Sequence, residues 1–112
     1  METVTFYLGF SCILLHEMDA IRCKEWRIFP LTYFLNDKVG YIVFLLAHLP
    51  LYYFLMISLN NQGVQYGLNI FFIIHLGLHL LFLKHPKNEF RDWVSWLPII
   101  GAALFGSLGL IV

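Results

Sequence analysis

Four long apolar stretches separated by short polar connections dominate this sequence. They cover residues 3 to 21, 39 to 59, 66 to 83 and 94 to 112. A membrane-spanning helix needs about 20 mostly apolar residues, so each stretch is long enough to cross a bilayer. In a chain of 112 residues, four spans leave only about 32 residues for the ends and connections. The sequence therefore predicts one all-α domain over residues 1–112, an integral membrane four-helix bundle.

The composition excludes several other classes of protein. The chain is 60% hydrophobic, 18% aromatic and only 12% charged, whereas an ordinary globular domain is about 25% charged. It has no basic surface and no glycine-rich phosphate loop, so we expect membrane lipids as surroundings and no nucleic-acid partner. Cys12 and Cys23 are eleven residues apart on one predicted helix, too distant for a disulfide, and are expected to be free thiols.

The basic residues predict how the chain is oriented in the membrane. All seven lie in the connections after the first and third stretches: Arg22, Lys24, Arg27, Lys38, Lys84, Lys87 and Arg91. Both connections must lie on one side of the membrane, and the positive-inside rule makes that side cytoplasmic. Both termini are then on the non-cytoplasmic side.

The first connection, residues 24–38, is unusually apolar for a loop. It carries Phe29, Leu31, Tyr33 and Phe34 around Pro30. Such a segment favours the membrane interface over the aqueous phase. We expect it to lie flat on the cytoplasmic face and to cover whatever lies below it.

Ionisable side chains within membrane segments are costly and usually functional. Six occur here: His16, Glu17, Asp19, His48, His75 and His79. At 100° per residue, His16 and Asp19 share one stripe of the first span, while Glu17 points about 100° away. His75 and His79 are four residues apart and share a helix face, a spacing by which two imidazoles can reach one metal ion.

Depth in the membrane supports the same grouping. His16 and His79 lie six and five residues from the nearest basic residue of the adjoining connection, which places both roughly 8 to 9 Å below the cytoplasmic boundary. His48 and His75 lie ten and nine residues away, in a second layer at roughly 14 to 15 Å. Histidines from different spans are therefore expected at matched depths, as a metal site in a bundle core requires.

The first functional hypothesis is a divalent-metal site, zinc or iron, near the cytoplasmic face. Its predicted ligands are His16, Asp19, His75 and His79. The ion would act as a Lewis acid or activate water, with Glu17 or His85 as general acid or base, on a lipid-like substrate that arrives laterally.

Two alternatives remain open. A small-residue face on the last span, formed by Ala102, Gly106 and Gly109, would suit an accessory or assembly subunit of a larger membrane complex, or a homo-oligomer. His48 and His75 lie at one depth and would suit haem or chlorophyll ligation, although His48 alone is more simply explained by a hydrogen bond. The remaining acids are expected to be solvated: Glu25, Asp37, Glu89 and Asp92.

Several of these positions resemble a known pattern. His16 and Asp19, the Trp26 and Pro30 region, and the later His75, His79, Arg91 and Pro98 resemble small uncharacterised bacterial membrane families of the HxxEE type. The two acid positions of that motif fall on Asp19 and Ala20, so one acid is present. The resemblance implies a multi-span protein of a bacterial inner (or thylakoid) membrane with a site at His16 and Asp19, and it implies no particular reaction.

Overall fold

The computed structural model describes residues 2–29, 31–90 and 92–111. Pro30, Arg91 and Val112, which entered the sequence analysis, lie outside this part of the chain. The described residues form four long helices and one short 3-10 helix, with no strand: α1 (Glu2–Arg22), η1 (Glu25–Arg27), α2 (Asp37–Ser58), α3 (Gln62–Leu81) and α4 (Trp93–Ile111).

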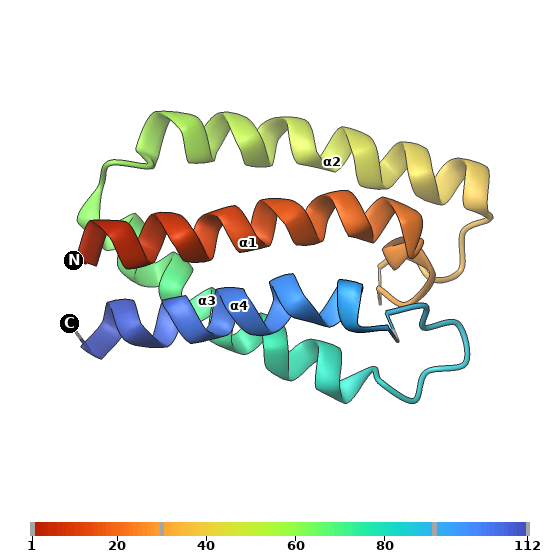
Figure 1. The fold of residues 1–112 in the computed structure, drawn as a ribbon. Coiled ribbons are helices and arrows are strands. Elements are labelled where there is room, and N and C mark those ends of the chain that lie inside the picture. The colour runs from red at the N-terminus through yellow and green to blue at the C-terminus, as the bar shows by residue number, and fades with distance from the viewer. Residues whose placement is uncertain (1, 30, 91, 112) are drawn as a thin grey trace.

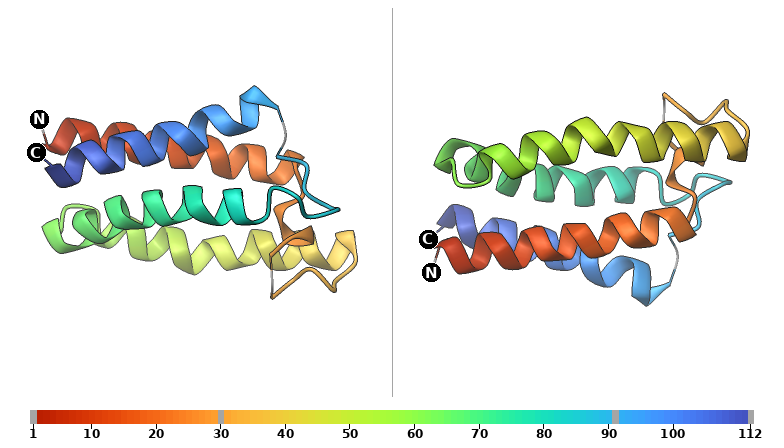
Figure 2. Two further views of the ribbon diagram at one scale, coloured as in Figure 1. Left: turned by 90° about the horizontal axis from the view of Figure 1, so that it is seen from below. Right: turned by 90° about the horizontal axis from the view of Figure 1, so that it is seen from above.

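All four long helices have the length and apolar composition needed to cross a membrane. The four helices lie lengthwise beside one another (Figures 1 and 2). Both chain ends lie at one end of the bundle, and η1 and the connection between α3 and α4 lie at the other end. The predicted all-α four-helix bundle is therefore confirmed.

Side-chain caps determine where three helices begin. Asn36 Oδ1 accepts a hydrogen bond from the Val39 N–H at 2.9 Å, and Asn61 Oδ1 accepts one from the Val64 N–H at 3.1 Å. Asp92 Oδ1 caps α4 in the same way, at 3.0 Å from the Ser95 nitrogen. Each cap pairs an amide that the helix itself cannot satisfy. The Asn61 cap also explains why α3 begins at Gln62, before the expected residue 66.

Helix α4 is packed against both α1 and α3 through its small residues. Ala102 and Gly106 are buried in this contact. A Cβ atom added at Gly106 would lie 2.8 Å from the Asn69 carbonyl oxygen and 3.2 Å from Phe72 Cβ. The small-residue face of the last span thus lets α3 approach closely within one chain, as small residues do in membrane bundles.

Helix α2 stands apart from this three-helix unit. Only Gly40 and Leu55 of α2 are buried, and its main packing partner is η1. Trp26 of η1 lies so close to Gly40 that an added Cβ would be 2.5 Å from Trp26 Cδ1. The Trp26 indole N–H also donates to Asp37 at 3.1 Å. Trp26 therefore anchors the start of α2, and most of the remaining side chains of this helix are apolar and exposed.

Candidate metal centre

Three histidines from two helices meet in the bundle. His16 comes from α1, and His75 and His79 come from one face of α3. The His16 ring centroid lies 4.4 Å from that of His75 and 4.8 Å from that of His79, and the two α3 rings are 4.6 Å apart. All three side chains are buried. The structure brings these three predicted ligands together, and it places His75 beside His16 although the depth counted from the sequence grouped His75 with His48.

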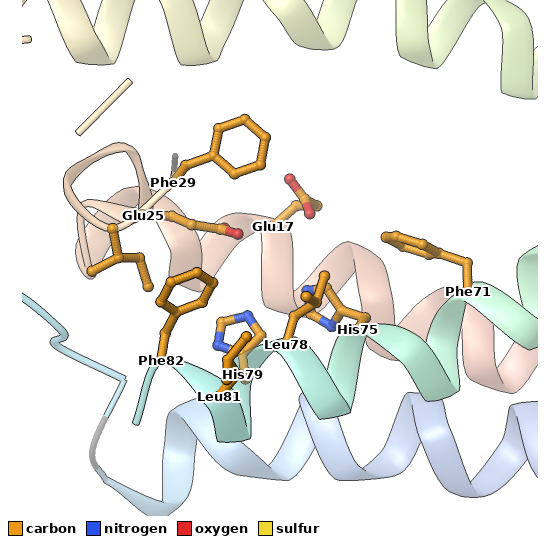
Figure 3. Close-up of a pocket in the computed structure, with 10 residues that line it drawn as sticks. Glu17, Glu25, Phe29, Phe71, His75, Leu78, His79, Leu81 and Phe82 are labelled. Atoms are coloured by element: carbon orange, nitrogen blue, oxygen red, sulfur yellow. The ribbon is translucent and has the colours of Figure 1, made fainter. Parts of the chain in front are cut away.

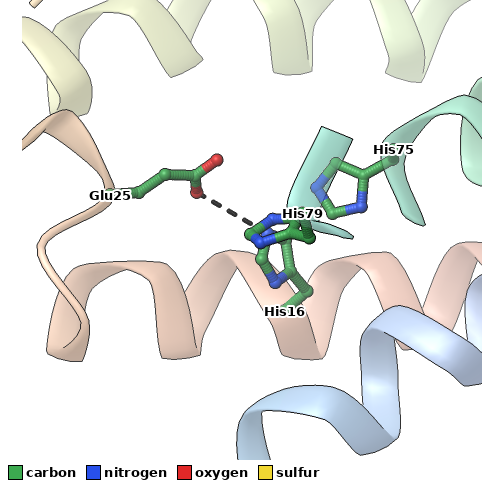
Figure 4. Close-up of side chains that lie close together, drawn as sticks. All are labelled: His16, Glu25, His75 and His79. Carbon is green, nitrogen blue, oxygen red and sulfur yellow. Dashed lines mark ion pairs between the residues drawn. The ribbon is translucent and has the colours of Figure 1, made fainter. Parts of the chain in front are cut away.

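The fourth member of the cluster is Glu25, not Asp19. The chain leaves α1 through Lys24, whose φ of 53° and ψ of 56° are left-handed, and this sharp turn directs Glu25 back over His16 (Figure 4). Glu25 Oε2 lies 3.6 Å from His16 Nε2. One ligand atom from each of the four residues lies within 4.8 Å of all the others. The expectation that Glu25 is solvated was wrong, because this oxygen is buried.

Polar atoms without a hydrogen-bond partner are concentrated in this cluster. Among the described residues, five buried side-chain nitrogen or oxygen atoms have none, and four of them are here: both ring nitrogens of His16, His75 Nδ1 and Glu25 Oε2. Leaving such a group unpaired costs about 1–3 kcal/mol. Burial disfavours the charged form of Glu25, but the facing imidazole of His16 outweighs it, so the Glu25 pKa is lower than usual. The cluster is thus arranged as a carboxylate facing three imidazoles.

Asp19 contributes to a different network. Its Oδ1 accepts from Arg22 Nε at 2.7 Å, and Arg22 Nη2 also donates to Ser95 Oγ at 2.9 Å and pairs with Asp92 at 3.3 Å. Three helical residues advance about 300°, so Asp19 is about 60° away from His16 around α1. This offset directs Asp19 to the start of α4 and His16 to α3. The structure here differs from the ligand set expected from the sequence.

Glu17 and His48 form a second pair beside the cluster. His48 Nε2 is 2.5 Å from Glu17 Oε2, and His48 Nδ1 is 2.6 Å from the Phe44 carbonyl oxygen. His48 is therefore engaged with Glu17, while His75 is in ring contact with His16 and His79. The two deep histidines are not arranged as a pair of axial ligands.

A cavity of about 310 Å³ adjoins the cluster. Figure 3 shows its lining side chains, which come from α1, from η1 and the residues after it, and from α3 and its end. The polar lining residues are Glu17, Glu25, His75 and His79, and the apolar ones are Ile28, Phe29, Phe71, Leu78, Leu81 and Phe82. Glu25, Ile28 and Phe29 belong to the connection expected to cover the site, and they form part of the cavity wall.

His85 lies outside this lining. It is in the turn that follows α3, where its Nδ1 accepts a hydrogen bond from the Lys87 backbone N–H at 3.1 Å. Of the two residues considered as general acid or base, Glu17 is the one beside the cavity.

Comparison with known proteins gives one result. The sequence profile of a family of unknown function, DUF6713, matches residues 2–112. The chain belongs to this family. The match fits the expectation of an uncharacterised family, but it gives no support for the HxxEE type in particular. No curated protein and no solved structure matches this DUF6713 member.

Proposed function

We propose that this protein holds a divalent metal ion in the membrane and uses it on a lipid-like substrate. The carrying observation is the convergence of His16, His75, His79 and Glu25, whose ligand atoms lie within 4.8 Å of one another. Imidazole and carboxylate donors suit Zn²⁺ and Fe²⁺. Zinc bonds of about 2.0–2.1 Å place tetrahedral ligands about 3.4 Å apart, so binding requires the side chains to converge by roughly 1 Å.

The ion would supply Lewis-acid chemistry at the buried end of the cavity. His16, His75, His79 and Glu25 would hold the ion, which would polarise a substrate oxygen or activate a water molecule. Glu17 lies on the cavity wall, where its carboxylate is placed to exchange a proton with a bound water or substrate. Asp19 would act indirectly, by holding Arg22 at the start of α4.

The site would lie near the cytoplasmic face of a bacterial inner (or thylakoid) membrane. The connection that carries Glu25 also carries Lys24 and Arg27, and the positive-inside rule assigns such connections to the cytoplasm. A membrane-dissolved substrate would reach the cavity from the side, within the bilayer, and would not need to cross the interface.

Elemental analysis of the detergent-purified protein tests this function. We expect about one zinc or iron atom per chain, reduced at least tenfold in His79→Ala. His85→Ala is the matched control, since it removes a histidine of the same region that lies outside the cavity lining, and it should keep the metal. Protein that carries no stoichiometric metal, or a His79→Ala variant that keeps it, would overturn the proposal.

A second candidate function, an accessory subunit of a larger membrane complex, is favoured by α2. Its exposed apolar residues include Leu46, Leu49, Tyr53 and Met56, a surface that partner helices or lipid could cover. Gentle extraction followed by native separation tests the subunit function. A particle larger than two copies supports the subunit function, and a monodisperse monomer or dimer rejects it.

A further inference from the structure

The cavity beside the histidine cluster has a one-sided charge distribution. Two carboxylates line it, from Glu17 and Glu25, and no lysine or arginine is among its described lining residues. A divalent ion bound by the histidines would be balanced by these two carboxylates. An anionic group entering the cavity would face these two carboxylates and an ion whose charge they already offset, so its lost hydration would be poorly compensated in a membrane interior.

The two arginines that the structure describes, Arg22 and Arg27, are already paired with acids. Arg22 pairs with Asp19 and Asp92. Arg27 pairs with Asp37 and Glu89. A phosphate group at the cavity would have to compete with these carboxylates, so neither of these two arginines is available as a ready-made phosphate ligand.

The rest of the cavity wall is apolar and partly exposed to the membrane. Phe29, Phe71 and Leu78 are 48%, 43% and 44% exposed, so the cavity is open along the α3 side. Its volume of about 310 Å³ is near the lower limit of about 300 Å³ for small-molecule pockets. At roughly 30 Å³ per methylene-sized group, as for a water molecule, it holds one chain of about ten carbons.

We propose that the ligand of this cavity is a neutral amphiphile that inserts one hydrocarbon chain, such as a fatty alcohol or a monoacylglycerol. Its uncharged oxygen head lies against the histidine cluster, and its chain lies along Phe71 and Leu78 toward the bilayer. This inference rests on the proposed metal site for the position of the head, and on the charge and shape of the cavity for the class of ligand.

Photocrosslinking of the purified full chain tests the ligand class. The two probes are a fatty alcohol with a diazirine in its chain and the phosphate monoester of the same alcohol. On the unaltered protein we expect the alcohol to label cavity residues at least tenfold more than the phosphate ester does. Equal labelling by both probes, or stronger labelling by the phosphate ester, would overturn the proposal without the need for any variant.

A cavity-filling substitution tests the location. Leu78→Trp would occupy the space of the chain, and Ile74→Trp is the matched control one turn earlier on α3, where the side chain is 54% exposed and outside the cavity lining. Labelling by the alcohol should fall at least tenfold in Leu78→Trp and stay within twofold in Ile74→Trp. Labelling that persists in Leu78→Trp would place the ligand elsewhere and overturn the proposal.

The metal content of the same samples separates this inference from the proposed function. Selective labelling by the alcohol in protein without metal supports the ligand class and rejects the metal function. Stoichiometric metal with unselective labelling rejects the ligand class and leaves the metal function intact.

Discussion

At the scale of single residues, Glu25 distinguishes a metal site from a simple histidine cluster. It supplies the only carboxylate in the group of four ligand atoms, and its Oε2 is buried beside His16. Glu25→Gln keeps the shape and removes the charge. Loss of a residue that merely orients a metal ligand typically weakens metal binding about 10- to 100-fold, and we expect at least that loss in Glu25→Gln, measured by competition with a chelator.

Glu89→Gln is the control for this substitution. Glu89 pairs with Arg27 of η1 at 3.1 Å but lies outside the group of four ligand residues. The metal affinity of the Glu89→Gln variant should stay within threefold of that of the unaltered protein. Equal weakening of metal binding in Glu25→Gln and Glu89→Gln would mean that the charged residues of both connections, and not a carboxylate at the site, govern binding.

Asp19 provides the opposite test. Because its carboxylate is held by Arg22 and lies on the α4 side of α1, Asp19→Asn should keep full metal content while lowering thermal stability through the lost ion pair. Metal content and melting temperature are measured on one preparation. A folded Asp19→Asn variant that has lost its metal would restore Asp19 as a ligand.

The three histidines of the site could be predicted from the sequence, but its carboxylate could not. Within a helix, phase and depth follow from residue number, and this puts His79 level with His16 and His75 on the same helix face as His79. Glu25 follows the left-handed turn at Lys24, where helical periodicity no longer applies. The apolar residues of the connection predicted a cover over the site without indicating which side chain points down from it.

At the scale of helices, close packing of α4 against α3 holds His75 and His79 in place. Gly106→Ala puts a methyl group 2.8 Å from the Asn69 carbonyl oxygen, and overpacking of this kind typically costs about 1–3 kcal/mol. Gly77→Ala is the matched control in α3, because its added Cβ meets nothing within 4 Å. It should be neutral or gain up to about 1 kcal/mol from helix propensity.

Unfolding in mixed micelles with increasing SDS measures both variants. Equal stability of Gly106→Ala and Gly77→Ala would contradict the close approach of α3 and α4.

The four spans themselves were predictable, because length and hydropathy suffice to locate membrane-spanning helices. The separation of α2 was not, since a helix that is apolar on all sides gives little indication of which neighbour it packs against.

At the scale of the whole molecule, the proposed site requires one orientation of the chain in the membrane. Cysteine substitutions at Gln62, the first residue of α3, and at Lys87, in the connection that follows this helix, test the orientation because both positions are exposed. In intact cells an impermeant thiol reagent should label Gln62→Cys and not Lys87→Cys, because the positive-inside rule predicts that the basic connections are cytoplasmic. The unmodified chain, with free Cys12 and Cys23, gives the background. The reverse labelling would place the site at the outer face.

X-ray absorption of the metal-loaded protein is the most direct test of the proposed metal centre, because it identifies the ligand atoms. For zinc we expect a first shell of nitrogen and oxygen at about 2.0–2.2 Å, without sulfur, together with the outer-shell scattering of three imidazoles. In His16→Ala the imidazole contribution should fall by a third or the metal should be lost. A sulfur shell at about 2.3 Å, or a spectrum without imidazole scattering, would contradict a metal centre built from His16, His75 and His79.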